Sequence, residues 1–311
     1  MQGRYYWNKR TGDAIKKSVE YFQQAIDRDP NYALAYAGQA EAYLLLPAYS
    51  AAAPNEAFPK AVATAKRALE LDETLAEAHT ALAGALITDG HNLAESNREY
   101  QRAIALNPNY ATAHHWYGEV NLMLMGRPDE AIAEMKRAIE LDPFSLIFNA
   151  DLAEVYIHAR RYDEAIEQLK KTIEMDQNFY VSHWYLGKAY AMKGAYPEAI
   201  AAYQRARQLN DDPWVLALLG HVAGASGKKE EALKTAEQLK EISKQRYVPA
   251  YGFALVYSGL NDKDRAFQWL EKSHQDHESK IVNFLTTDPL LENVRSDPRY
   301  KDLVRRVGLP E

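Results

Sequence analysis

Histidines are the first residues to test for metal or acid–base chemistry, and the chain has nine of them. His274 and His277 are three residues apart and share a face if the segment is helical, but no third ligand is close in sequence. His114 and His115 are adjacent, so their rings point to different faces of a helix and are badly placed to chelate one ion. We therefore predict no metal site.

Other patterns that carry catalysis are absent from the sequence. No Gly-rich phosphate loop follows a strand, and no Gly-x-Ser-x-Gly nucleophile motif is present. The chain has no cysteine, which excludes disulfides, thiolate metal ligands and a cysteine nucleophile. We therefore predict that the protein is not an enzyme and holds no cofactor.

The net charge and the hydropathy of the sequence limit the kinds of molecule that we expect the chain to bind. The net charge is −6, so the chain has no excess of basic residues to neutralise nucleic-acid phosphates. No apolar run is long enough to span a bilayer, and no signal peptide is recognisable. These features predict a cytoplasmic protein that binds neither nucleic acid nor membrane.

An internal repeat in the sequence predicts the helices that would position any functional site. One column of small residues has successive spacings of 43, 35, 35, 34, 34, 33 and 34. A second column lies seven residues later with the same spacings, and a third precedes the first. The first column consists of Ser18, Ala61, Ser96, Ala131, Ala165, Ala199, Ala232 and Ala266.

Each unit has the pattern of two amphipathic helices. In residues 111–143 the first helix is predicted from Thr112 to Met125, and a Gly-Arg-Pro-Asp turn follows it. The second helix carries an apolar stripe and stops at Asp142-Pro143, because proline cannot continue the hydrogen-bond ladder. The small columns mark the places where two helices cross closely.

These residues resemble the tetratricopeptide repeat, a 34-residue helix-turn-helix unit with small residues near positions 8, 20 and 27. Gly187, Ala199 and Ala206 match this pattern in one unit. The resemblance implies an all-α, right-handed superhelical solenoid over residues 1–277. It implies a truncated first unit at 1–32, seven complete units and an insertion near 46–54, interpreted as a surface loop.

Residues 278–311 depart from the repeat and are predicted to form a C-terminal capping segment. Its last helix is expected from Pro298 to Arg306, after an Asp-Pro N-cap. The segment resembles the end of tetratricopeptide regions in large bacterial signalling proteins, namely winged-helix regulators, adenylate cyclases and Ser/Thr kinases. This resemblance and the truncated first unit predict that the chain is a fragment of a longer protein.

Position 4 of the repeat, usually tryptophan in the family, is histidine in three units: His79, His114 and His183. One interpretation is that these histidines replace a packing residue and hydrogen-bond between helices. The other is a histidine ladder that senses pH.

In the family, the first helices of successive units line a concave groove. Carrying its groove positions onto this chain predicts an apolar and aromatic surface with a few acidic points, in which Trp184, Trp214 and Tyr251 form one partly exposed strip. The alternative is that the register is shifted by one residue and these rings pack between helices. The predicted partner-binding residues are Thr112, His115, Glu119, Ile147, Glu154, His158, Val181, Trp184, Lys188, Trp214, His221 and Tyr251.

The resemblance implies a non-catalytic scaffold that binds a protein or peptide segment in this groove. A first alternative is a sensory region of a larger bacterial signalling protein, which binds a small ligand or its own effector domain. A second alternative is an enzyme assembled from groove residues such as His115, Glu119, Glu154 and His158, although no nucleophile or cofactor cradle supports it.

Overall fold

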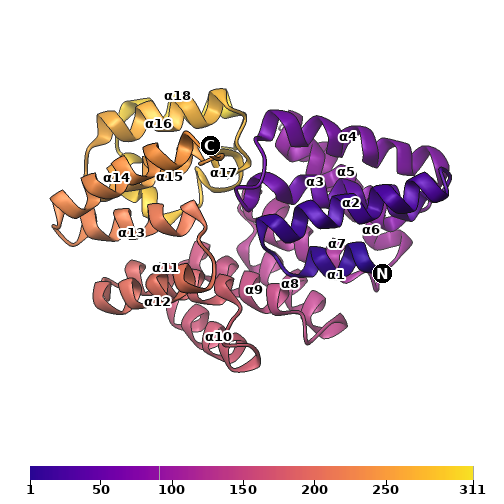
Figure 1. Cartoon of the computed structure of the whole chain (residues 1–311), viewed down its shortest axis with the longest axis horizontal. Coiled ribbons are helices and arrows are strands. Elements are labelled where there is room, and N and C mark those ends of the chain that lie inside the picture. The colour runs from indigo at the N-terminus through magenta and orange to yellow at the C-terminus, as the bar shows by residue number, and fades with distance from the viewer. Residues whose placement is uncertain (91, 311) are drawn as a thin grey trace. The chain divides into compact units, whose positions relative to one another are not determined.

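The computed structural model describes residues 1–90 and 92–310 (Figure 1). Within these residues every regular element is a helix and no strand is present, so the all-α class predicted from the sequence is confirmed. None of the described helices is both long and apolar enough to cross a bilayer. The chain divides into two compact units, residues 1–143 and 144–311.

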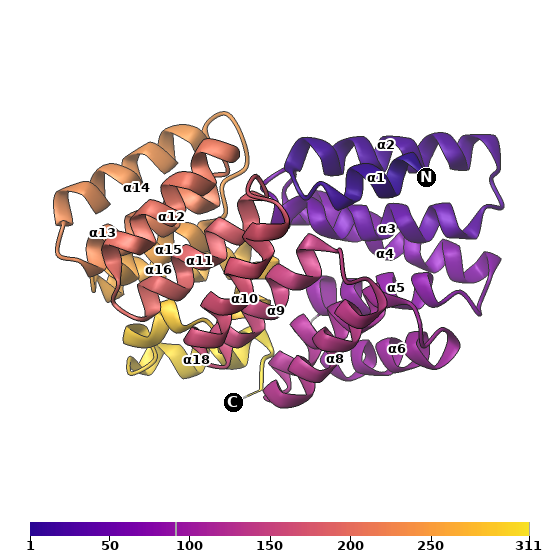
Figure 2. The same ribbon diagram turned by 90° about the horizontal axis from the view of Figure 1, so that it is seen from below.

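Unit 1 begins with a short helix that lies along the second one (Figure 2). Consecutive helix hairpins follow, and each packs on the next. The elements of unit 1 are α1 (Gln2–Asn8), α2 (Gly12–Arg28), α3 (Ala33–Ala48), α4 (Pro54–Leu71), α5 (Ala76–Gly90), α6 (Leu93–Leu106), α7 (Ala111–Trp116), the π-helix η1 (Tyr117–Leu122) and α8 (Pro128–Leu141).

Unit 2 contains four hairpins and the C-terminal segment. Its elements are α9 (Leu146–His158), α10 (Tyr162–Met175), α11 (Tyr180–Met192), α12 (Tyr196–Leu209), α13 (Pro213–Ala225), α14 (Lys229–Ser243), α15 (Ala250–Gly259), α16 (Lys263–Gln275), α17 (Ser279–Phe284), the 3-10 helix η2 (Pro289–Val294) and α18 (Pro298–Val307). We call α9, α11, α13 and α15 the inner helices, because they contact one another in sequence, and α10, α12, α14 and α16 the outer helices.

The small-residue columns lie where the helices of each hairpin cross. Ala131, Ala165 and Ala199 are completely buried. A Cβ atom added to Gly187 would lie 2.6 Å from the Tyr203 ring, which shows how closely α11 and α12 approach. The spacing of the columns is therefore a consequence of helix packing.

The turns inside the hairpins repeat as well. Gly126, Gly194 and Gly227 have positive φ values at equivalent turn positions, and so do the non-glycine residues Arg160 and Asn261. Glycine adopts this left-handed conformation without steric cost, whereas Arg160 is held in it at φ 61°.

The extra residues near 46–54 mostly lengthen two helices. Helix α3 continues to Ala48 and α4 starts at Pro54, so only residues 49–53 form the connection. Leu46 and Pro47 belong to α3 and are buried, because the apolar run before them extends the helical pattern. The expectation of a nine-residue surface loop was wrong in this respect.

The last helix agrees closely with the sequence pattern. Helix α18 runs from Pro298 to Val307, and the Asp297 side chain caps it by accepting a hydrogen bond from the Arg299 amide. Arg306 pairs with Glu271, so α18 is held against outer helix α16.

Candidate functional site

The inner helices of unit 2 are covered by a segment of the same chain. We call residues 278–294, which include α17 and η2, the covering segment. Its side chains reach all four inner helices: Thr287 bonds to His158 on α9, Asp288 lies beside Lys188 on α11, and Lys280 lies over the Trp214 ring on α13. The carbonyl of Leu290 accepts a hydrogen bond from Ser258 on α15.

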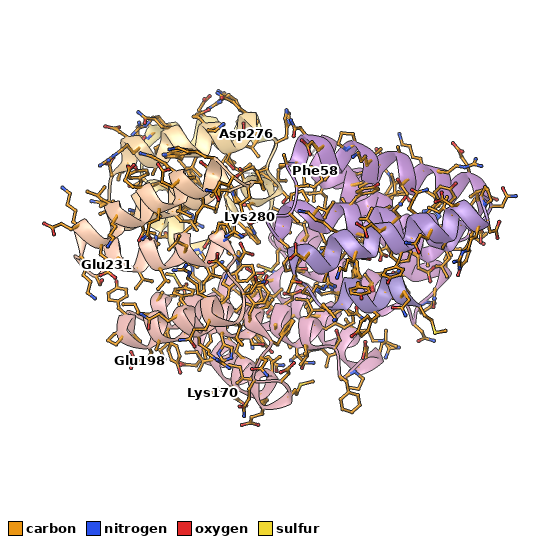
Figure 3. The ribbon with its side chains drawn as sticks, viewed as in Figure 1. Phe58, Lys170, Glu198, Glu231, Asp276 and Lys280 are labelled. Carbon is orange, nitrogen blue, oxygen red and sulfur yellow. The ribbon has the colours of Figure 1, made fainter. Side chains whose placement is uncertain are left out.

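The charged side chain of Lys280 lies in a different environment from the charged side chains on the outer helices. Figure 3 labels Lys280 on the inner side of unit 2, where its side chain is buried. Glu198 on α12 and Glu231 on α14, labelled in the same view, lie at the exposed rim of the outer helices. The covering segment therefore lies against the inner helices and places polar side chains there.

The aromatic strip predicted from the sequence exists. The Trp184 and Trp214 ring centroids are 6.2 Å apart, and those of Trp214 and Tyr251 are 6.1 Å apart. The expectation that the strip is exposed was wrong, because Trp184 is only 6% exposed, Trp214 3% and Tyr251 0%. The covering segment lies outside the repeat, so the repeat pattern could not indicate that it shields these rings.

The charged ammonium group of Lys280 lies over the aromatic rings of the strip. Its ammonium lies 4.1 Å from the centroid of the Trp214 ring and 5.7 Å from that of Trp184, within the range of a cation–π interaction. Burial lowers the pKa of Lys280, while the carboxylates of Glu154 and Asp212 act in the opposite direction. The inner face therefore accepts a cation at this point through ring faces and nearby negative charge.

A buried polar row continues from α9 to α11. The Lys188 ammonium lies 3.0 Å from His158 Nε2, 3.4 Å from Asp288 Oδ1 and 3.7 Å from Glu154 Oε1. Glu154, His158 and Lys188 are predicted groove residues, and the structure brings them together. Asp288, from the covering segment, supplies a second carboxylate to the same lysine.

The protonation state of His158 follows from its two neighbours. Lys188 donates to Nε2, which must therefore carry no proton, and Nδ1–H donates to Thr287 Oγ1 at 2.8 Å. Burial lowers the pKa of His158, and the charge of Lys188 lowers it further, so the neutral ring fits both contacts. Burial acts to raise the pKa of Glu154, but its contacts with His158, Lys188 and Tyr185 lower it to about 2.

The two ends of the covering segment are anchored on α15. Glu278 accepts hydrogen bonds from the Ala250 and Tyr251 amides at the start of this helix, at 2.6 and 3.0 Å. Near the helix end, Asn293 Nδ2 donates to the Ser258 carbonyl at 2.7 Å. Both contacts satisfy backbone groups that a helix terminus leaves open.

Three other predicted groove residues lie on the inner helices of unit 2 but outside the buried polar row. Ile147 and Val181 are buried on the inner helices. His221 donates through Nδ1 to the Leu255 carbonyl at 2.9 Å, which joins α13 to α15, and burial lowers its pKa. These residues support the packing of the inner helices, and the charge of Asp288 in the covering segment acts to raise the pKa of His221.

The remaining predicted residues belong to unit 1. Thr112 is buried on α7, and His115 Nε2 lies 3.3 Å from Glu119 Oε2. Burial lowers the pKa of His115 to about 4. Glu119 lies on η1, a π-helical turn that sequence periodicity did not reveal.

A charged contact missed by sequence reasoning also lies in unit 1. Arg4 on α1 pairs with the fully buried Glu41 on α3, and Tyr110 donates to the other oxygen of Glu41 at 2.6 Å. Arg4 Nη2 also bonds to the Tyr110 hydroxyl at 3.2 Å. Glu41 occupies the same repeat position as Glu119 and Glu154, so α1 delivers a cation to an equivalent carboxylate.

Two of the position-4 histidines bridge helices. His79 reaches Glu99 at 2.6 Å and the Glu73 carbonyl at 3.0 Å, and His114 reaches Glu134 at 2.5 Å. His183 contacts the Gln177 carbonyl at 3.0 Å. The predicted inter-helix hydrogen bond is present at His79 and His114. The hydrogen bond to Glu99 raises the pKa of His79. At His114 burial acts to lower the pKa, but the contact with Glu134 raises it.

Tetratricopeptide repeat family models match residues 80–145, 122–186 and 181–213. Residues 80–213 are therefore built from tetratricopeptide repeats. The matches and the hairpin geometry confirm the superhelical repeat class expected from the sequence. Proteins of this family are in general non-catalytic scaffolds for protein–protein interaction.

Curated relatives include the transcriptional regulator HilA of Salmonella typhimurium, which is 26% identical over 143 residues. This match covers 46% of the present chain and only 26% of HilA. HilA of Salmonella typhi gives the same values.

Solved structures with the same fold include Cut9 in the Cut9–Hcn1 complex, with a TM-score of 0.66, 16% identity and coverage of 98% of this chain and 54% of that chain. Human IFIT1 gives a TM-score of 0.62 at 17% identity, covering 95% and 66%. Yeast Tom70 gives 0.54 at 17% identity, covering 98% and 66%. At these identities the likeness concerns the fold alone.

Proposed function

We propose that this protein is a non-catalytic interaction scaffold, and that the inner face of unit 2 binds a peptide or protein segment. The observation that supports this proposal is the covering segment itself. It is held on this face by a buried lysine, an ion pair and a histidine–threonine hydrogen bond. Each contact recognises one side chain of a peptide, as expected for a peptide-binding surface. A cytoplasmic location is part of this proposal.

A specific observation favours a second candidate function. The similarity to a transcriptional regulator over 143 residues supports a regulatory region of a larger bacterial signalling protein. In that case the occupant of the inner face would be a small ligand or an effector domain of the same protein. A DNA-binding, cyclase or kinase domain encoded directly upstream of Met1 would favour this candidate.

The test of peptide binding uses the absence of native cysteine. His158 Nδ1 and Thr287 Oγ1 are in contact at 2.8 Å, so we choose the double variant His158→Cys/Thr287→Cys and test whether its two thiols form a disulfide. Oxidation then locks the covering segment on the inner face, and reduction releases it. The same polypeptide is thus compared in two states.

Peptides selected from a random displayed library on the reduced chain should bind it and lose at least about tenfold in affinity when the disulfide forms. Mass spectrometry verifies the bond, and circular dichroism verifies equal helix content in both states. If no peptide binds the reduced chain, or if binding is equal in both states, the inner face of unit 2 is not the binding surface.

A further inference from the structure

The covering segment contains a pattern that specifies what the inner face recognises. Lys280, Phe284 and Asp288 follow one another at intervals of four residues. Lys280 and Phe284 are one turn apart on α17, and Asp288 is the N-cap residue of η2. Because of this spacing, each side chain meets a different part of the inner face.

The surroundings of Lys280 on the inner face favour a positively charged side chain. Lys280 is buried, and its ammonium contacts the Trp214 ring face at 4.1 Å. Burying an ammonium is costly unless negative charge compensates it, and here Glu154, Asp212 and the ring faces do so. A neutral side chain at this position would leave Glu154 and Asp212 with less positive charge nearby.

The aromatic position lies between the two lysines. The Phe284 ring centroid is 5.2 Å from that of His158, 5.4 Å from the Lys188 ammonium and 5.6 Å from the Lys280 ammonium. An aromatic ring offers its negative face to both cations, and here its plane is tilted by 46° from that of the His158 imidazole. An aliphatic residue of similar size offers no such face.

The acidic position completes the pattern. Asp288 is completely buried, with Oδ1 3.4 Å from Lys188. Removing this charge would leave Lys188 with Glu154 as its one remaining carboxylate within 4 Å among the described residues. The inner face therefore discriminates for an acid at this point.

The shape of the covering segment is imposed by the face. Helices α17 and η2 have six residues each, which is too short to be stable without tertiary contacts. A segment of another protein with the same side chains is therefore able to adopt the same shape on this surface. The flanking anchors at Glu278 and Asn293 hold α15 and lie outside the lysine-to-aspartate pattern.

Unit 1 supplies an independent example of the same chemistry. Helix α1, with seven residues, carries Arg4 onto Glu41 and Tyr110. Glu41 is the repeat-position equivalent of Glu154. In both units a cation from a short helix thus lies near a buried carboxylate at this repeat position, with aromatic residues beside it.

We infer that the partner of this protein is a short helical peptide segment with a lysine or arginine, an aromatic residue four positions later and a carboxylate four positions after that. It binds the inner face of unit 2 in place of residues 280–288. This inference rests on the proposed function. The chain's own segment competes with the partner, because tethering gives it an effective concentration of roughly millimolar order.

The probe is a fluorescent synthetic peptide of residues 279–290, titrated into the full chain and into the full-chain variant Phe284→Ala. Weakening the chain's own segment should strengthen binding of the peptide at least about tenfold. A second full-chain variant, Lys280→Gln, gives the same comparison if Phe284→Ala folds poorly by circular dichroism.

Changes in the peptide test the recognised chemistry. The peptides Lys280→Gln, Phe284→Ala and Asp288→Asn should each bind the weakened chain at least about tenfold less tightly. The matched control is Thr286→Ser, because the half-buried Thr286 side chain makes no hydrogen bond within the described residues, and it should bind within about twofold of the parent peptide.

The outcomes separate this inference from the proposed function. If the 279–290 peptide fails to bind the weakened chain while library peptides bind the reduced His158→Cys/Thr287→Cys chain, the inference is overturned and the proposed function stands. Equal binding of all the changed peptides also overturns the inference. If neither kind of peptide binds, both fail.

Discussion

Lys188 is the residue whose removal tests the buried polar row most directly. Its ammonium lies within 4 Å of Glu154 and Asp288, which are almost completely buried carboxylates. The substitution Lys188→Met keeps most of the side-chain volume and removes the charge. Breaking a buried ion pair by removing one partner costs about 3–5 kcal/mol, because the other charge stays buried without compensation.

The pKa of Glu154 gives a second measure of the same effect. Its fall from the ordinary 4.5 to about 2 corresponds to about 3 kcal/mol in favour of the ionised form. Lys188 is one of three residues responsible for this fall, along with His158 and Tyr185, and it also neutralises Asp288. We therefore expect Lys188→Met to lower the free energy of unfolding of unit 2 by about 3 kcal/mol at pH 7.

The pH dependence of this loss has a definite sign. A carboxylate with a lowered pKa in the folded state stabilises the protein above its unfolded pKa, and this contribution disappears as the pH falls toward about 2. In Lys188→Met the Glu154 carboxylate should bind a proton at higher pH, and the neutral group is less costly to bury. The difference between the two proteins should therefore shrink as the pH falls below about 4.

Urea unfolding at pH 7 and pH 3.5, combined with hydrogen exchange of peptides from α9, α11 and α17, measures this effect in the relevant helices. The matched control is Lys171→Met, because Lys171 is exposed and pairs with Glu167 at 2.7 Å on the outer helix α10. It should change stability by less than about 1 kcal/mol. Equal stability of Lys188→Met and the parent at pH 7, or a loss that does not shrink in acid, would refute the reasoning.

Four other changes have measurable consequences. Trp184→Ala should lower the stability of unit 2 by roughly 3–5 kcal/mol and speed hydrogen exchange of the covering segment, because the indole is buried beneath it; an unchanged melting curve would contradict this burial. Ala165→Leu should cost roughly 1–3 kcal/mol through overpacking, with exchange increased mainly in its own and neighbouring hairpins; a uniform increase along the chain would argue against a repeat architecture. His114→Asn should destabilise unit 1 by about 1 kcal/mol at pH 6 and less at pH 9, since the raised pKa of His114 gives stability that is lost as pH rises through it; urea unfolding at both pH values checks the sign. His158 has a lowered pKa, so acidification below the unfolded value of about 6.5 should weaken the covering segment, and His158→Gln should reduce that pH dependence in exchange measurements.

The repeat was predictable because its causes are local in sequence and periodic. Ala165 and Ala199 mark helix crossings, and Asp297 before Pro298 marks a helix start. Trp184 and Trp214 were expected side by side for the same reason, and their rings are neighbours, although both are buried.

The covering segment was not predictable from the same signals. Residues 278–294 do not repeat, and their partners are remote: Thr287 and His158 are 129 residues apart in the sequence. A single lysine such as Lys280 is typical of an exposed surface, and nothing in the sequence indicates that two tryptophans bury it. The π-helical turn at η1 and the lengthened α3 also depend on packing that periodicity does not report.

The covering segment buries two kinds of side chain in unit 2, apolar and charged. Ile281, Val282 and Leu291 are buried apolar residues that add to the core without specifying an orientation. Lys280 and Asp288 cost free energy to bury, and they are stable there only because Trp214 and Lys188 match their charges and positions. Apolar side chains of similar volume would often be equally stable at such sites. Paired charges at these positions are therefore what our proposal expects, because they fix the orientation of the segment, whereas closing the core would need apolar side chains alone.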